Sequence, residues 1–264
     1  MLTFILLCLL VGSVVGFLAG LFGIGGGLVI VPTLVYLLPM IGVPEPLLMS
    51  AALGTSFATI VITGFSSAQR HHKLGNIEWN AVKVLAPMVM ISVFISGLFI
   101  GKLDREVSAK IFACLVVYLA TKMVISIKKS TGKTKPLTTQ ASVIGGILIG
   151  MASSAAGVGG GGFIVPFLNS RGIDMKKAIG SSAFCGALLG LSGMFSFMVS
   201  GWGNPSMPDY SLGYIYLPAV LGITASSFFT SKLGATATSK LPVPTLKKGF
   251  ALLLVAIAVD MFMK

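Results

Sequence analysis

A glycine-rich block occurs twice in this chain, and each copy interrupts a strongly apolar stretch. Residues 23–27 read GIGGG with Pro32 behind them, and residues 157–161 read GVGGG with Pro166 behind them. Glycine weakens a helix, and an opened helix inside a membrane is tolerated only where it lines a cavity. Two matching breaks in an apolar chain are typical of secondary transporters built from internal repeats, so the breaks predict where a substrate binds.

The composition indicates a polytopic membrane protein, which we expect to be multi-pass in the bacterial inner (plasma) membrane. Hydrophobic residues make up 55% of the chain and charged residues 10%, whereas a soluble domain has about a quarter charged residues. The net charge of +12 comes from basic residues dispersed through short loops, so we expect no nucleic-acid partner. Three single cysteines within apolar segments predict packing rather than disulfide or zinc roles: Cys8, Cys114 and Cys185.

The two blocks divide the chain into similar halves, residues 1–127 and 138–264, joined by a hydrophilic linker at 128–137. Further matches extend the repeat, such as residues 52–56 with 178–182, and 74–77 with 212–215. The first residues continue into the first block, so we expect a retained helix and no signal peptide. Each half shows five apolar segments, near 2–22, 27–40, 47–69, 79–101 and 107–127, and near 138–156, 162–170, 176–200, 211–231 and 244–263.

The basic loops orient these segments, because positive loops remain in the cytoplasm. The loops near 70–83, 128–135, 171–177 and 232–248 are basic, whereas those near 39–47 and 201–210 carry no lysine or arginine. We therefore expect both termini outside. Each half becomes a glycine-broken helical hairpin followed by three transmembrane helices, and three crossings make the halves inverted copies. The fold class expected is an all-α integral membrane protein with two inverted-topology repeats. The basic loop at 102–110 is an exception, because it falls outside.

The broken helices suggest how an anion is held. A helix that starts near the third glycine of a block directs free N–H groups and its positive dipole end into the membrane, as helix N-termini do when they bind oxyanions. Hydroxyl pairs at the start of the next span in each half add donors, although such hydroxyls also bond to their own helix. Gly12, Gly16 and Gly20, spaced by four, favour close helix packing instead. The expected substrate-binding residues are Gly23, Gly25, Gly26, Gly27, Thr55, Ser56, Gly157, Gly159, Gly160, Gly161, Ser181 and Ser182.

Two other functions remain open alternatives. A cation or metal permease would use backbone carbonyls at the helix ends near Phe22 and Ala156, although no buried carboxylate is evident. A membrane enzyme lacks a nucleophile–base pair, a metal motif or a carboxylate dyad. We expect His71 and His72 to lie in a solvated basic loop and predict no metal site, cofactor or enzymatic activity. The expected partners are a small anion and the lipid bilayer, with a homodimer as an alternative to the monomer.

These residues resemble the sulfite exporter TauE/SafE family of membrane proteins. The resemblance covers essentially the whole chain and is carried by both glycine blocks with their prolines, by residues 52–56, and by the Leu-Gly-Tyr-Ile-Tyr-Leu-Pro segment at 212–218. It implies a carrier that exports small anionic sulfur compounds such as sulfite or sulfonates. The second glycine run extends to Gly162, one residue further than the first, so the two breaks differ slightly in sequence.

Overall fold

The computed structural model describes residues 2–128, 136–246, 248–249, 251–252 and 255, and they are mainly helical. The first half contains α1 (Leu2–Phe22), α2 (Gly27–Leu37), α3 (Leu48–Lys73), α4 (Trp79–Ile100) and α5 (Arg105–Lys128), with 3-10 turns η1 (Leu38–Ile41) and η2 (Glu45–Leu47) between α2 and α3. The second half contains α6 (Thr139–Ala156), α7 (Gly161–Ser170), α8 (Met175–Ser200), β1 (Ser211–Leu212), β2 (Ile215–Tyr216) and α9 (Leu217–Lys240).

Capping chemistry sets several helix boundaries. The Thr138 hydroxyl accepts a hydrogen bond from the Ala141 N–H before α6, and the Asp174 carboxylate accepts one from the Lys176 N–H before α8. At the other end of α6, Gly157 adopts the left-handed conformation (φ 57°) that commonly stops a helix. The broken hairpin of the second half therefore begins and ends where local sequence chemistry dictates.

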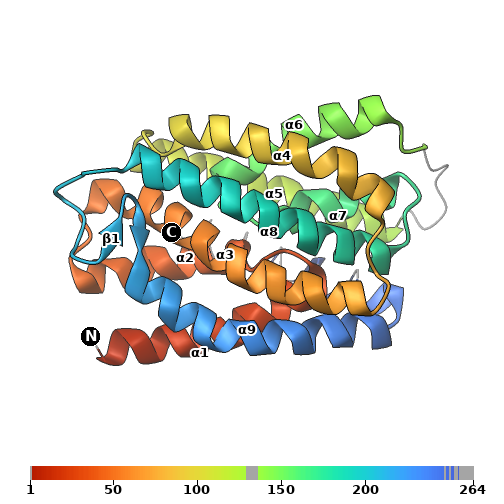
Figure 1. The fold of residues 1–264 in the computed structure, drawn as a ribbon, viewed down its shortest axis with the longest axis horizontal. Helices are drawn as coiled ribbons and strands as arrows, with labels where there is room; N and C mark the ends of the chain where they lie inside the picture. Colours follow the sequence, from red (N-terminus) through yellow and green to blue (C-terminus); the bar gives the residue numbers. More distant parts are fainter. Residues whose placement is uncertain (1, 129–135, 247, 250, 253–254, 256–264) are drawn as a thin grey trace.

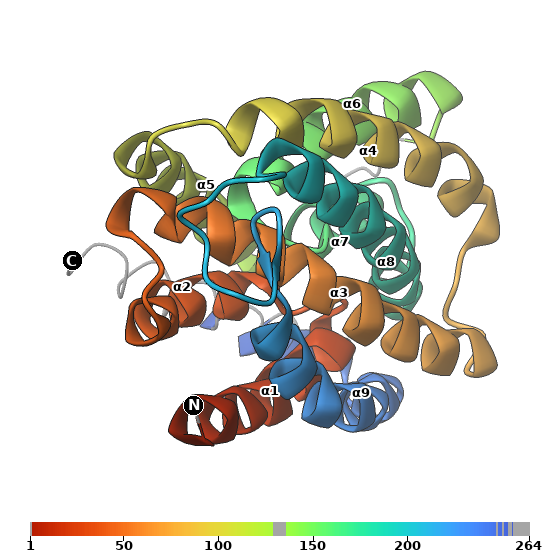
Figure 2. The same ribbon diagram turned by 60° about the vertical axis from the view of Figure 1, so that its left-hand side comes forward.

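The helices pack as three layers (Figures 1 and 2). Helices α3 and α8 lie side by side in the middle, α1 and α9 cover one side of them, and α4 and α6 cover the other. Each outer layer therefore combines one helix from the first half of the chain with one from the second. The N-terminal end of α1 and the β1–β2 hairpin lie at one end of the layers, and the α3–α4 connection lies at the opposite end (Figure 1).

Glycines bring the helices of the outer layers into backbone contact. A Cβ atom added to Gly20 would lie 2.0 Å from the Ser231 carbonyl oxygen of α9, and Gly12 and Gly16 are equally crowded by α9. On the other side, Gly150 of α6 packs in the same way against Ser92 and Val89 of α4. The packing interpretation of Gly12, Gly16 and Gly20 is thus confirmed. Lipid provides no hydrophobic driving force between helices, so these close van der Waals contacts hold them together.

The helices support an all-α, multi-pass membrane protein. Within the described ranges, five helices are long and apolar enough to cross a membrane: α1, α3 with its preceding turn, α4, α6 and α8. The expected span near 211–231 was placed wrongly, because residues 211–216 form a small antiparallel hairpin that pairs Ser211 with Tyr216, and the helix follows at 217–240. Most of the linker at 128–137 and much of the segment near 244–263 lie outside the described residues.

Candidate functional site

Both glycine blocks break the helices where the sequence predicts. Helix α1 ends at Phe22 and α2 begins at Gly27, while α6 ends at Ala156 and α7 begins at Gly161. The breaks depend on backbone angles that favour glycine, because five residues have positive φ: Gly23, Gly25, Gly26, Gly157 and Gly160. Gly26 and Gly160, at φ 89° and 77°, are the N-caps of α2 and α7, and neither helix start is capped by a side chain.

The two breaks touch each other through their backbones. A Cβ atom on Gly27 would lie 2.0 Å from the Gly157 carbonyl oxygen, and one on Gly161 would lie 2.2 Å from the Ile24 Cα. Gly25 and Gly159 also face each other, since a Cβ on Gly25 would lie 3.2 Å from the Gly159 Cα. The structure therefore brings the two predicted glycine sets together, and several of these positions exclude any side chain.

Two serines from α3 and α8 tie the breaks together in a matching way. The Ser56 hydroxyl donates to the Gly157 carbonyl oxygen at 2.9 Å, and the Ser182 hydroxyl donates to the Gly23 carbonyl oxygen at 3.2 Å. Ser56 corresponds to Ser182 in the sequence repeat, and Gly23 corresponds to Gly157. Each half thus supplies a hydroxyl to the break of the other half, and both hydroxyls are fully buried.

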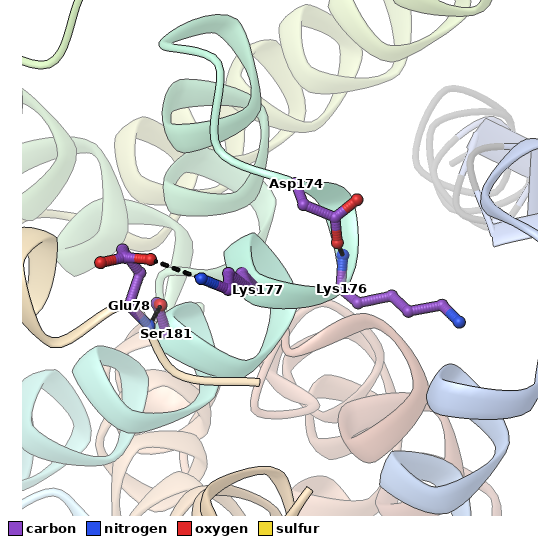
Figure 3. Close-up of polar contacts among 5 residues, drawn as sticks. All are labelled: Glu78, Asp174, Lys176, Lys177 and Ser181. Atoms are coloured by element: carbon purple, nitrogen blue, oxygen red, sulfur yellow. Dashed lines mark hydrogen bonds and ion pairs between the residues drawn. The ribbon is translucent and has the colours of Figure 1, made fainter. Parts of the chain in front are cut away.

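The neighbouring hydroxyls accept backbone hydrogen bonds, again in matching positions. Thr55 Oγ1 accepts from the Tyr216 N–H at 3.0 Å, and Ser181 Oγ accepts from the Glu78 N–H at 2.8 Å. Beside Ser181, the Lys177 ammonium pairs with the Glu78 carboxylate at 2.9 Å (Figure 3). All four predicted hydroxyls therefore bond to backbone groups of the other half in this conformation, two as donors and two as acceptors.

Buried amide groups without acceptors line the breaks. Among the residues that the structure describes, no acceptor bonds the backbone N–H groups of residues 25–28 in the first break, or of Gly159, Gly161 and Gly162 in the second. All of these residues are buried. Orphaned buried N–H groups are rare in proteins, and here they cluster where two helix N-termini meet. The breaks therefore combine two helix N-termini and their free N–H groups with apolar side chains such as Ile60, and the described side chains in contact with them carry no charge.

Sequence analysis missed two residues of α3 that contact the breaks. The Thr63 hydroxyl lies 3.2 Å from the Gly25 carbonyl oxygen and 2.8 Å from the Thr59 carbonyl oxygen. A methyl group of Ile60 fills the space beside Gly25, Gly159 and Gly190, since a Cβ on each glycine would lie 2.9 Å from it. Ile60 and Thr63 follow Ser56 by four and seven residues, which places all three on one face of a helix. That spacing would have identified the buried face of α3.

The expectation that His71 lies in a solvated loop was wrong, whereas His72 is exposed as expected. Both lie in the last turn of α3 rather than in a loop. His72 is exposed, but His71 is 0% exposed and its Nε2 lies 3.1 Å from the Gly20 carbonyl oxygen. The helix continues four residues beyond the expected end of the apolar segment, which places His71 two turns after Thr63 on the buried face.

A cavity of about 770 Å³ lies between α2, the start of α3 and α5. Its walls are mainly apolar, and its charged residues form ion pairs, Arg105 with Glu45 and Lys110 with Glu106. The hydrogen bond from Lys110 lowers the pKa of Glu106 from its usual value. Because each basic residue at this cavity faces a carboxylate, the cavity is less suited to a free anion than the breaks are.

Comparison with known proteins identifies relatives along the whole chain. The model of the family described as Sulfite exporter TauE/SafE matches residues 8–261. A probable membrane transporter protein of Haemophilus influenzae is 80% identical over 264 residues, which is 100% of both chains. A second, from Methanocaldococcus jannaschii, is 29% identical over 89% of this chain and 86% of its own length, and one from Bacillus subtilis is 27% identical over 92% of each. No solved structure matches the chain.

Proposed function

Because this chain belongs to the sulfite exporter TauE/SafE family, we propose that it is a secondary transporter that exports small anionic sulfur compounds such as sulfite or organosulfonates. The names of its relatives support a membrane transporter rather than an enzyme. The substrate class and the mechanism below are the proposal. We further propose that the chain is embedded in the plasma membrane with both termini outside.

The buried amides of the two breaks carry this proposal. An unsatisfied buried donor costs about 1–3 kcal/mol, and an anion that accepts from several of them would recover that cost. The two helix N-termini pack against the opposite breaks, Gly27 beside Gly157 and Gly161 beside Ile24, so both dipoles would add to the attraction for negative charge at this junction. A compact oxyanion with several acceptor oxygens matches a cluster of backbone donors from both halves.

The contacts between the halves support an alternating-access cycle as the mechanism. In the proposed cycle the Ser56 and Ser182 hydroxyls exchange their carbonyl partners, Gly157 and Gly23, for oxygens of the anion. Ile60 leaves little room between the breaks in the present conformation, so the halves must separate slightly before the anion enters. Ser56 and Ser182 make equivalent hydrogen bonds, and so do Thr55 and Ser181, each to a backbone group of the other half. This equivalence supports two structurally similar repeats of inverted topology.

The cation permease is the alternative that the same breaks allow. It would need free carbonyl oxygens, yet those of Gly23, Gly25 and Gly157 lie within hydrogen-bond distance of hydroxyls from Ser182, Thr63 and Ser56. Within the described part of the chain, no group of three or more His, Cys, Asp or Glu side chains surrounds a common point. These observations favour the anion as the cargo.

Ligand-dependent thermal stability tests the proposal. Purified protein is melted with sulfite, an alkyl sulfonate, a carboxylate of similar size, or a divalent metal ion. A ligand at about a hundred times its Kd stabilises a protein by about 2.7 kcal/mol, which is a measurable shift in Tm. We expect sulfite or the sulfonate to stabilise, and proteoliposomes loaded with that ligand to release it. Stabilisation by the metal alone would instead support the cation permease.

A further inference from the structure

Of the Asp, Glu, Lys, Arg and His side chains that the structure describes, only that of His71 is buried. It lies near the end of α3, between α1 and the final turn of α9. Histidine is the side chain whose protonation changes between about pH 5 and 8, so a fully buried one is a candidate proton site. The anion mechanism does not use it.

The His71 ring joins three elements of the structure. Its Nε2 lies 3.1 Å from the Gly20 carbonyl oxygen in the last turn of α1, and its Nδ1 lies 3.4 Å from the Asn76 side-chain amide. That amide also donates to the Ser239 hydroxyl of the α9 end at 2.9 Å. Next to it, the Thr238 hydroxyl lies 2.7 Å from the Leu21 carbonyl oxygen. His71 and Thr238 therefore cap the end of α1, one turn before the first break.

Hydrogen bonding alone does not prevent His71 from taking a second proton. Protonated imidazole donates from both nitrogens, and the Asn76 amide can turn over so that its oxygen faces Nδ1. The cost comes from charge. An imidazolium that is shielded from water loses hydration, and among the residues that the structure describes no carboxylate bonds to the ring to compensate for that loss.

The charged groups around His71 are mainly basic. Helix α1 carries no charged residue, while Arg70, His72 and Lys73 flank the ring on α3. Two carboxylates on the adjoining segments are already engaged, because Glu78 pairs with Lys177 and Asp174 caps α8 (Figure 3). The remaining groups on the neighbouring elements are Lys176, whose ammonium donates to the Ser239 carbonyl, and Lys232 and Lys240 on α9.

We propose that His71 is a proton-binding site whose protonation releases the end of α1 from α3 and α9 and thereby opens the protein at this end. The neutral ring suits the closed arrangement described here, whereas the charged ring favours an arrangement in which water reaches it. Acidification therefore favours opening, and a return to neutral pH favours closure. This rests on the proposed function only in that the opening is a step of transport.

Opening at His71 would act directly on the first break. Gly23 lies three residues after Gly20, and a Cβ on Gly23 would lie 2.4 Å from the Ile179 carbonyl oxygen of α8. The second half has no counterpart of this site, because the position matching His71 is Phe197, which is also fully buried. Protons would thus control one end of the carrier and not the other, so the opening of that end would depend on the pH of the solution that reaches His71.

Hydrogen–deuterium exchange in the absence of any substrate tests the proposal, so its result does not depend on which cargo is carried. The intact protein is labelled at about pH 5.5 and about pH 7.5, on either side of the usual histidine titration, with labelling times scaled to the intrinsic exchange rate. A tenfold difference in proton affinity between the two arrangements changes their ratio by up to about tenfold. We therefore expect up to about tenfold faster scaled exchange at residues 17–22 and 234–240 at the lower pH.

Three variants separate a proton site from a structural role. His71→Gln keeps a hydrogen-bonding side chain without titration and should lose the acid response, whereas His72→Gln, at the exposed neighbour, should keep it. Asn76→Asp places a carboxylate beside Nδ1, which stabilises the imidazolium in the closed arrangement and should also reduce acid opening. An acid response that persists in His71→Gln, or a wild-type protein with no acid response at these segments, would overturn the proposal, and the latter result needs no variant to fold.

Discussion

Gly162 offers a way to remove one donor of the proposed anion site without changing a side chain that carries chemistry. It is the second residue of α7, its N–H has no acceptor among the described residues, and its φ lies outside the left-handed region. Proline is tolerated in the first turn of a helix because that turn's N–H groups make no intrahelical bond. Gly161 precedes it and has no Cβ to clash with the proline ring.

We expect Gly162→Pro to weaken sulfite binding strongly and Gly162→Ala to weaken it little. Both variants add a Cβ, which must displace the end of the Leu119 side chain, 2.9 Å away, but only proline removes the N–H. A hydrogen bond to a charged group contributes about 1.5–3 kcal/mol, so the Kd for proline should exceed that for alanine by about ten- to one-hundred-fold.

Calorimetric titration with sulfite measures this difference, and melting without ligand checks that the two variants are equally stable. Equal affinities in the proline and alanine variants would refute a role for this amide. If that equal affinity is lower than the affinity of the wild type, the loss comes from the displaced Leu119 side chain rather than from the missing donor.

Two further predictions concern topology and the source of affinity. Single cysteines at Ser170 and Ser206, in a background that lacks Cys8, Cys114 and Cys185, should react with an impermeant reagent from opposite sides of the membrane; reaction of both from the same side would contradict the proposed topology, in which α8 crosses the membrane between them. Ser56→Ala combined with Ser182→Ala should weaken equilibrium binding of sulfite by about 1–3 kcal/mol. By contrast, Arg70→Gln should slow capture and leave affinity nearly unchanged, because the half-buried Arg70 side chain bonds to Thr236 rather than to the breaks, and charge near the surface is screened over about 8–10 Å. The reverse order of affinities in the two mutants would indicate a basic vestibule instead of a backbone site.

The sequence was most informative where one residue type determines the backbone. Consecutive glycines predicted both helix ends, Phe22 and Ala156, because few other residues adopt the angles found at Gly26 and Gly160. Glycines spaced by four predicted the packing face of α1, since the period of a helix places them on one side. These predictions needed only local chemistry.

The partners of the site hydroxyls depended on contacts between distant segments and were not predictable in the same way. Ser56 bonds to a carbonyl 101 positions away, and Ser182 to one 159 positions away. The sequence repeat aligned these serines without showing that each would bind the opposite break. His71 was misplaced for a related reason, because its neighbours in sequence are charged while its neighbours in space are Gly20 and Asn76.

The pairing of α1 with α9 has a consequence for how the chain is made. Gly12 packs against Ile223, a residue synthesised about 200 positions later, so α1 enters the membrane long before its partner exists. Until then its glycine face has only lipid or temporary partners, and lipid offers no comparably close contact. Helix α6 differs, because α4 is already present when it emerges. The layer of α1 and α9 can therefore form only after α9 has been synthesised, later than the layer of α4 and α6.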